Sequence, residues 1–266
     1  MYLPPTSTNL KDSPPASRRM FVALVGAPGS GKTEGALTFP SPFVLDMDGG
    51  LIKHIGQDLP NIPIYKHEEC ERLKLEFRPK DNTFNRIDWI YRWIGTEGPK
   101  FEEGQTLIID SLTSLEDCYN RWYDVEINPR CSKSGEVDKF FFWSNKITVF
   151  SRIIAALKGL RCNVVITMHE MREMEDGEIT SKIKPVLQSG YAPRLPKEFD
   201  EYIRCIARFP SETGNAQQNA KITTDVGPIT SPTYLWQIKP NDSFNAKSRC
   251  SRKETYIRAG YKELTY

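Results

Sequence analysis

The sequence predicts an α/β fold, with a mostly parallel central sheet flanked by helices and antiparallel strands added in the C-terminal third. Three observations support this prediction. A glycine-rich loop at residues 26–33 joins a strand-like run to a helix-like stretch. Short apolar runs then alternate with stretches whose apolar residues recur at helical spacing, which is typical of a parallel sheet covered on both faces. Beyond residue 170 the pattern changes to one of hairpin-like strands.

Length and composition limit the organisation of the chain. It has 266 residues, of which 39% are hydrophobic, enough to form a substantial core. The net charge of +2 excludes a chain that is polybasic throughout, so any nucleic-acid site must be a local patch. We expect residues 1–19, which contain four prolines, to form a flexible arm. Residues 20–240 would then be the core and residues 241–266 a basic C-terminal tail.

The cysteines and the hydropathy pattern indicate a compartment. None of the six cysteines belongs to a C-x-x-C pair, and no histidine lies at zinc-ligand spacing from them. We interpret them as reduced thiols in a cytoplasm, with a structural zinc site as the less favoured alternative. The N-terminus lacks the apolar stretch of a signal peptide, and no apolar run approaches the length of a membrane span. We therefore expect a cytoplasmic protein without a membrane partner.

The glycine-rich loop fits the phosphate-binding pattern G-x-x-x-x-G-K-[ST] at every fixed position. Its residues are Gly26, Ala27, Pro28, Gly29, Ser30, Gly31, Lys32 and Thr33. In such a loop several backbone N–H groups point at the phosphates, the lysine reaches the β- and γ-phosphates, and the threonine hydroxyl binds Mg²⁺. The alternative is a chance glycine-rich turn. The strand before the loop and the helix after it favour a nucleotide site, with ATP and Mg²⁺ as the cofactors.

The other elements follow in chain order. We predict strands over residues 42–46, 62–65, 106–110, 163–168, 202–207 and 234–238, where apolar and β-branched residues cluster. One helix is predicted over residues 84–94, with Ile87, Ile90, Tyr91 and Ile94 on one face. A second is predicted from the spacing of Trp143, Ile147, Phe150, Ile154 and Leu157. Residues 175–178 read as a hairpin turn and residues 211–220 as a polar loop.

An acidic residue follows the most apolar of these strands. Asp110 comes directly after Thr106-Leu107-Ile108-Ile109, which has the form of a Walker B strand. A P-loop needs such a carboxylate to help hold Mg²⁺. The alternative is an aspartate that caps a helix beginning near Ser111. The P-loop earlier in the chain favours the metal role.

The order of these motifs resembles one group of proteins. It combines the P-loop, a strand ending in Asp46-Met47-Asp48-Gly49-Gly50, the strand ending in Asp110-Ser111, and a strand ending in Thr167-Met168-His169-Glu170. From about Phe21 to Arg249 the chain resembles the phage-encoded RecA-like P-loop ATPases, often called phage nucleotide-binding proteins, some of which act as single-strand annealing proteins or recombinases. The resemblance implies a RecA-like fold and ATP hydrolysis. It also implies action on single-stranded DNA in phage recombination or strand annealing, in the cytoplasm of the host cell.

The same resemblance implies roles for the two aspartates after the second strand. Asp48 stands where RecA-like ATPases place a catalytic glutamate, so it would be the residue that orients and deprotonates water. The chain departs from the family here, because the aspartate is one methylene shorter, and this places fast hydrolysis in doubt. Asp46 is the fallback base. The alternative is that both aspartates only cap the turn at Gly49-Gly50.

Three further residues take roles from the resemblance. His169 follows a central strand, where related ATPases place a polar sensor near the γ-phosphate; a purely structural histidine is the alternative. Lys247 and Arg249 resemble the basic finger of RecA-type rings and filaments, in which one subunit inserts cationic side chains into the ATP site of its neighbour. The alternative is a solvated basic tail, since Arg252, Lys253 and Arg258 follow. The finger would imply self-association as a ring or filament.

Two segments are candidates for contact with single-stranded DNA, and a phage single-strand-binding protein would be a further partner. They are residues 128–139 and residues 170–197, which the resemblance places at the loops that bind DNA in RecA-like proteins. Cations and aromatic rings suit non-specific single-strand binding. In the first segment and just after it these are Arg130, Lys133, Lys139, Phe140, Phe141, Phe142 and Trp143. In the second they are Arg172, Lys182, Lys184, Tyr191, Arg194 and Lys197. The aromatic residues suit a helix core equally well, and the second segment also carries acids.

Two other functions remain open from the sequence. One is a nucleotide-gated assembly or scaffold protein with little turnover, which the short side chain of Asp48 favours. The other is a P-loop small-molecule kinase, which would need an arginine-rich lid that the sequence lacks.

Overall fold

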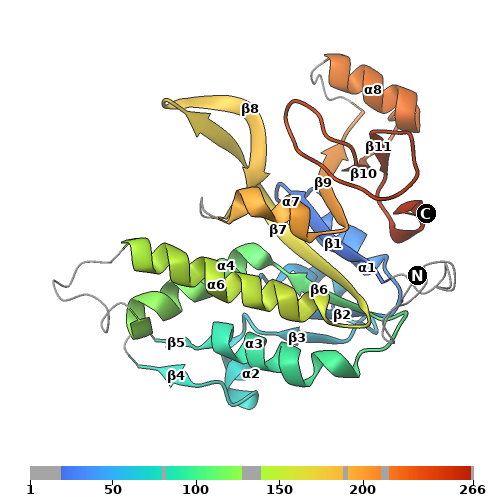
Figure 1. Cartoon of the computed structure of the whole chain (residues 1–266). Coiled ribbons are helices and arrows are strands. Elements are labelled where there is room, and N and C mark those ends of the chain that lie inside the picture. Colours follow the sequence, from blue (N-terminus) through green and yellow to red (C-terminus); the bar gives the residue numbers. More distant parts are fainter. Residues whose placement is uncertain (1–18, 80–81, 128–138, 188–190, 211–215, 265–266) are drawn as a thin grey trace, which may run out of the picture.

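The computed structural model describes residues 19–79, 82–127, 139–187, 191–210 and 216–264. Its centre is a nine-stranded sheet in the order β11-β10-β9-β1-β7-β6-β2-β3, with β8 paired to β7 (Figure 1). These strands are β1 (Phe21–Gly26), β2 (Pro42–Asp46), β3 (Asn61–Pro63), β6 (Thr106–Asp110), β7 (Asn163–Glu175), β8 (Glu178–Pro185), β9 (Glu201–Arg208), β10 (Thr233–Gln237) and β11 (Tyr256–Arg258). A separate two-stranded sheet pairs β4 (Phe77–Arg78) with β5 (Thr83–Phe84).

Strand direction confirms the predicted fold class. From β3 through β2, β6, β7 and β1 to β9, every neighbouring pair is parallel. In the C-terminal third β8, β10 and β11 are antiparallel to their partners. In register, Gly26 lies beside His169, and Asp46 lies beside Asp110. The carboxyl ends of β1, β7, β6 and β2 therefore meet at one edge of the sheet, where ligands collect in this class of fold.

Helices cover both faces of the sheet. Helices α3, α4 and α6 lie together on one face (Figure 1). The α-helices are α1 (Lys32–Leu37), α2 (His67–Arg72), α3 (Arg86–Thr96), α4 (Leu112–Trp122), α6 (Lys139–Lys158), α7 (Leu195–Glu198) and α8 (Ala216–Val226). Short 3₁₀ or π turns are η2 (Gly50–His54), η3 (Gly98–Lys100), η4 (Tyr123–Ile127), η5 (Ala192–Arg194) and η6 (Tyr261–Leu264).

The central strand β1 shows why its sequence is apolar throughout. Phe21, Ala23 and Val25 pack into the core beneath α3, α4 and α6. Val22 and Leu24 point to the opposite face and pack in a second core with α1. Because successive side chains of a strand alternate between faces, a strand buried on both sides needs an unbroken apolar run.

The C-terminal hairpin follows the predicted turn. Strand β7 is buried up to Met168 and continues as an exposed arm to Glu175, where it pairs with Glu178 of β8. The two turn residues, Asp176 and Gly177, have φ values of 52° and 85°. Positive φ at both positions matches the twist of the flanking strands. In Figure 1 this hairpin projects away from the sheet.

Three local predictions need correction. Strand β3 begins at Asn61 and ends at Pro63, which is earlier than the predicted residues 62–65. Tyr91 is 44% exposed, whereas the three isoleucines of the predicted face of α3 are buried, so the apolar stripe is narrower than predicted. Residues 216–220 begin helix α8 instead of lying in a polar loop; Ile222 is its only buried residue, so the sequence has little helical periodicity. Residues 211–215 of that predicted loop lie outside the described residues.

Several other expectations concern the termini, the cysteines and the membrane. Residues 1–18 of the predicted arm lie outside the described residues, as does Cys131. The cysteines in the described part of the chain, Cys70, Cys118, Cys162, Cys205 and Cys250, are free thiols. Strand β11 lies within the predicted C-terminal tail and pairs with β10. In the part of the chain that is described, no helix combines the length and the apolar character that crossing a membrane requires.

Candidate functional site

The glycine-rich loop connects the end of β1 to the start of α1, as the sequence predicts. Gly29 and Gly31 have φ values of 76° and 80°, in the left-handed region that favours glycine. Gly31 is the residue before α1, so the free N–H groups at the start of the helix follow it directly. The loop therefore has the backbone that anion binding requires.

Lys32 directs its ammonium group into this loop. Its Nζ donates to the carbonyl oxygens of Gly26 and Ala27, each at 2.9 Å. The residue is only 7% exposed, and burial lowers the pKa of its ammonium below the usual range. A cation held in a partly desolvated loop is attracted strongly to an anion, because few water molecules screen the interaction.

Thr33 and Asp110 lie together, which joins the P-loop to the end of β6. The Thr33 hydroxyl donates to Oδ2 of Asp110 at 2.9 Å, and the Thr167 hydroxyl donates to Oδ1. Asp110 is 3% exposed, and burial raises the pKa of its carboxyl group above the usual range. A Cβ added to Gly50 would lie 3.3 Å from Oδ2 of Asp110, so this glycine leaves the carboxylate accessible.

This oxygen pair fits Mg²⁺. Hydroxyl and carboxylate oxygens are the hard ligands that Mg²⁺ prefers, and Mg²⁺ usually takes only one or two protein ligands with phosphate and water oxygens. Thr33 and Asp110 therefore suit a metal that arrives with a phosphate ligand.

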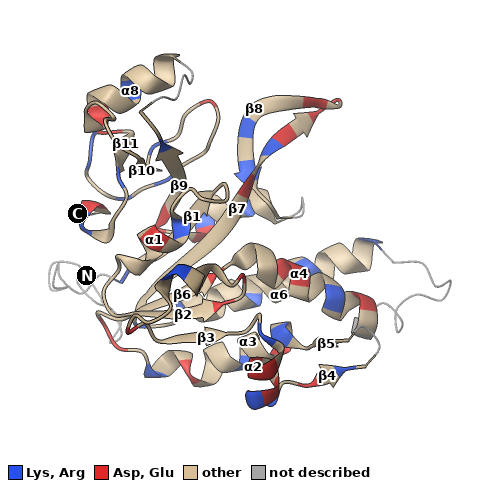
Figure 2. Ribbon diagram, turned by 180° about the vertical axis from the view of Figure 1, so that it is seen from behind, with Lys and Arg blue, Asp and Glu red and all other residues tan. Residues whose placement is uncertain are grey.

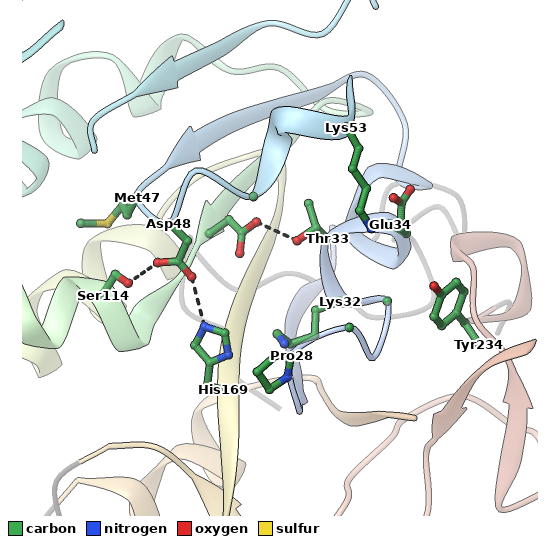
Figure 3. Close-up of a pocket in the computed structure, with 14 residues that line it drawn as sticks. Pro28, Lys32, Thr33, Glu34, Met47, Asp48, Lys53, Ser114, His169 and Tyr234 are labelled. Carbon is green, nitrogen blue, oxygen red and sulfur yellow. Dashed lines mark hydrogen bonds and ion pairs between the residues drawn. The ribbon is translucent and has the colours of Figure 1, made fainter. Parts of the chain in front are cut away.

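The two aspartates after β2 have different surroundings. Oδ1 of Asp46 accepts hydrogen bonds from the backbone N–H groups of Asp48, Gly49 and Gly50, at 3.2, 2.8 and 3.3 Å. Asp46 therefore caps this turn, and burial raises the pKa of its carboxyl group. Asp48 does not cap the turn; its side chain lies at the edge of the cavity beside the P-loop (Figure 3). The capping alternative thus applies to Asp46 and not to Asp48.

Asp48 is held by residues from two other elements. The hydroxyl of Ser114, in the first turn of α4, donates to Oδ1. Nε2 of His169 lies 3.2 Å from Oδ2. Burial alone would raise the pKa of Asp48, but hydrogen bonds from His169, Ser114 and Ser111 outweigh it and hold this pKa below the usual range. The carboxylate is therefore ionised and fixed in place at neutral pH.

His169 lies where the buried part of β7 ends. Its backbone N–H donates to the hydroxyl of Thr113 at 3.1 Å, which links β7 to the start of α4. Its imidazole is 33% exposed and borders the cavity. The next residue, Glu170, forms a bidentate ion pair with Arg204 of β9, with distances of 2.8 and 3.0 Å. The histidine thus lies between the cavity and the base of the exposed hairpin.

These side chains surround one cavity of about 580 Å³, a volume typical of small-ligand sites (Figure 3). Its lining comes from the P-loop and the start of α1, the turn after β2 with η2, the end of β6, the start of α4, β7 and β10. The lining residues are Pro28, Gly29, Gly31, Lys32, Thr33, Glu34, Met47, Asp48, Gly50, Lys53, Asp110, Ser114, His169 and Tyr234. Sequence reasoning missed six lining residues, which are Glu34, Met47, Gly50, Lys53, Ser114 and Tyr234. Glu34 follows Thr33 directly, Met47 and Gly50 lie within two residues of Asp48, and Ser114 lies one turn beyond Asp110, so only these four were marked by a position in the sequence.

Lys247 and Arg249 lie away from this cavity. Lys247 pairs through its backbone with Tyr202, whose register partner Ala23 lies before the carboxyl end of β1. Its Nζ donates to the carbonyl oxygens of Pro196 and Phe199, at 3.3 and 2.6 Å. Arg249 forms an ion pair with Asp200 at 2.8 Å, and its side chain is 49% exposed. Neither cation reaches the cavity of its own chain, so any finger role requires a second chain.

The two candidate DNA segments differ in how much of them is described. Residues 128–138 of the first, including Arg130 and Lys133, lie outside the described residues. In α6, Phe140 is 84% exposed, whereas Phe142 packs against the core. In the second segment Lys182 pairs with Glu175 at 2.8 Å, and Lys184 pairs with Glu173 at 3.4 Å. Figure 2 shows both charges along this hairpin, so it is not a continuous basic surface.

The chain was also compared with known proteins. A family model described as an AAA domain matches residues 18–250. Among solved structures, the chain is similar to the RadB recombinase, with a TM-score of 0.37 and 17% sequence identity. The match covers 90% of this chain and 86% of that one. No curated protein matches the sequence.

Proposed function

Because this chain belongs to the AAA domain family, we propose that it binds ATP with Mg²⁺ at the cavity beside the P-loop and hydrolyses it. One observation supports this most strongly. The adjacent pair Lys32 and Thr33, together with Asp48 and Asp110, comes from three separate parts of the chain, and all four residues border the same cavity. A phosphate-binding loop, a metal-binding oxygen pair and an ionised carboxylate are the parts that hydrolysis of a nucleoside triphosphate requires.

Each residue would have a distinct part in the reaction. The P-loop backbone and Lys32 bind and orient the triphosphate. Thr33 and Asp110 would hold Mg²⁺, which when bound neutralises charge on the phosphates. Asp48 orients the attacking water and accepts its proton, while Ser114 and His169 keep the carboxylate in position.

We further propose that the ATPase acts on single-stranded DNA in recombination or strand annealing, as the resemblance to phage RecA-like ATPases implies. The exposed hairpin of β7 and β8 supports this proposal, because it begins next to His169 at the cavity. A strand bound along the hairpin would therefore be close to a residue that contacts Asp48. Self-association as a ring or filament, a phage single-strand-binding partner and the cytoplasm of a host cell belong to the same proposal.

A second candidate is a nucleotide-gated scaffold with little turnover. Ser114 and His169 each contact one carboxylate oxygen of Asp48. This favours a scaffold, because a restrained carboxylate is less free to approach water. Measuring ATP hydrolysis with and without single-stranded DNA separates the candidates. A DNA-stimulated ATPase supports the recombination proposal. ATP binding without turnover, with or without DNA, supports the scaffold.

A further inference from the structure

Tyr234 forms the wall of the cavity at the end opposite Asp48 and His169. In Figure 3 the carboxylate and the imidazole lie at one end, Lys32 and Thr33 lie between, and the ring of Tyr234 lies at the other end. Tyr234 belongs to β10 and is 43% exposed. Strand β10 lies second from one edge of the sheet, and the exposed face of an aromatic ring at the rim of a cavity is a surface on which a flat ligand can pack.

The P-loop itself supports this ring. A Cβ added to Gly31 would lie 2.6 Å from Cδ1 of Tyr234, so the ring packs directly against the backbone at the start of α1. Trp236, on the same side of β10, is fully buried and packs in the same way against Gly35. Two consecutive contacts therefore fix β10 against α1. The orientation of the Tyr234 ring is set before any ligand binds.

The two ends of the cavity differ, and this difference sets the orientation in which a nucleotide would bind. The γ-phosphate belongs between Thr33 and Asp48, because the metal ligands Thr33 and Asp110 and the water-orienting carboxylate of Asp48 must all reach it. The nucleoside is attached at the other end of the triphosphate. That end of the cavity is where Tyr234 lies, beyond Lys32 (Figure 3).

We propose that Tyr234 is the platform on which the base of the bound nucleotide stacks. This inference rests on the proposed ATP site and names the residue that recognises the base. Stacking acts on the face of the base, and its strength rises with the area of overlap. The site should therefore bind purine nucleotides more tightly than pyrimidine nucleotides.

Equilibrium binding of ATP and of inorganic tripolyphosphate, both with Mg²⁺, tests this assignment. Tyr234→Ala should weaken ATP binding about tenfold, the loss expected for one stacked base, and leave tripolyphosphate binding unchanged. Tyr234→Phe should bind both as the wild type does, because it keeps the ring. Tyr91→Ala, which removes a tyrosine of similar exposure from α3, is the matched control and should change neither.

A spectroscopic variant gives an independent readout. In Tyr234→Trp the indole should stack on the base, so ATP should change its fluorescence and tripolyphosphate should not. Equal weakening of both ligands by Tyr234→Ala would overturn the proposal, because the ring would then act only by supporting the P-loop. ATP binding that is unchanged in Tyr234→Ala would overturn it as well.

A wrong assignment of the ATP site would give different binding results from a wrong assignment of the base platform. Lys32→Ala should weaken both ligands, since it removes the cation of the phosphate site. If the wild type bound neither ligand, or if Lys32→Ala bound both normally, the proposed function would be wrong, and the base platform would fall with it. If only the Tyr234 variants behaved unexpectedly, the ATP site would stand and the base assignment alone would be lost.

Discussion

Nε2 of His169 lies 3.2 Å from Oδ2 of Asp48, so the point at which the buried part of β7 ends is joined to the turn that follows β2. Ser114 of α4 holds the other carboxylate oxygen. Three elements that leave the sheet at the same edge are thus connected through one carboxylate. Because His169 also begins the exposed hairpin, a change in the hairpin has a direct route to the position of Asp48.

This contact predicts the pH dependence of a His169→Ala variant. The hydrogen bond from His169 is one of the interactions that hold the pKa of Asp48 below its usual range, against the effect of burial. Without it the pKa of Asp48 should rise, so the acidic limb of kcat/KM for ATP hydrolysis should move to higher pH. The pH–rate profile measures this, with His67→Ala, which changes an exposed histidine that does not line the cavity, as control. An acidic limb that stays in place would show that His169 does not influence this carboxylate.

Substitution of Asp48 separates binding from chemistry. Asp48→Asn should bind ATP as the wild type does and lose about 10²–10⁴-fold in kcat, because an amide cannot accept a proton from water. Asp48→Glu should hydrolyse ATP faster than the wild type if the short side chain limits the reaction. Single-turnover hydrolysis and equilibrium ATP binding give the two quantities. Wild-type turnover in Asp48→Asn would remove Asp48 from the mechanism.

Thr33 gives a test of the metal site. Thr33→Val keeps the shape of the side chain and removes the hydroxyl that lies 2.9 Å from Asp110, whereas Thr33→Ser keeps the hydroxyl. We expect Thr33→Val to need about tenfold more Mg²⁺ for half-maximal hydrolysis, since even indirect losses around a metal cost that much. Thr33→Ser should resemble the wild type. An unchanged Mg²⁺ requirement in Thr33→Val would show that this hydroxyl is not a ligand.

The finger hypothesis predicts complementation between variants. If Arg249 acts on a neighbouring chain, Arg249→Ala should bind ATP normally and lose about a thousandfold in turnover. Mixing it with Lys32→Ala should restore part of the activity, since some interfaces then combine an intact P-loop with an intact arginine. Arg258→Ala, which removes an exposed arginine from the same C-terminal segment, is the control. Wild-type turnover of Arg249→Ala at every protein concentration would leave Arg249 with only its ion pair to Asp200.

The parts of the fold that the sequence predicted well are those where both faces of a strand are buried. The predicted bounds of β2 and β6 agree with the structure, because these short apolar runs end abruptly at a carboxylate. Helix α8 was missed because its surface is almost entirely exposed, so burial leaves no periodic pattern in its sequence. Tyr91 was misplaced for a related reason. Its spacing fits the apolar face of α3, but it lies at the edge of that face.

The candidate site could be predicted only where a local motif marks it. The P-loop and Asp110 are recognisable because each combines a residue pattern with an adjacent strand. The sequence could not decide which of Asp46 and Asp48 caps the turn, since the two are separated by one residue and the answer depends on backbone geometry. Tyr234 was out of reach, because its neighbour Gly31 is about two hundred residues away and only the pairing of β9 with β1 and β10 brings them together.

The central claim is that this chain binds ATP through its P-loop, and calorimetric titration of wild type and Lys32→Ala with ATP and Mg²⁺ tests it most directly. The wild type should bind one ATP per chain. Lys32→Ala should bind about tenfold to hundredfold more weakly, because the phosphates lose a charge-assisted hydrogen-bond donor. The variant should keep the melting temperature of the wild type to within a few degrees, since the hydrogen bonds of the Lys32 ammonium go to backbone carbonyls of its own loop. Absence of ATP binding by the wild type, or equal affinity in the two proteins, would contradict the account.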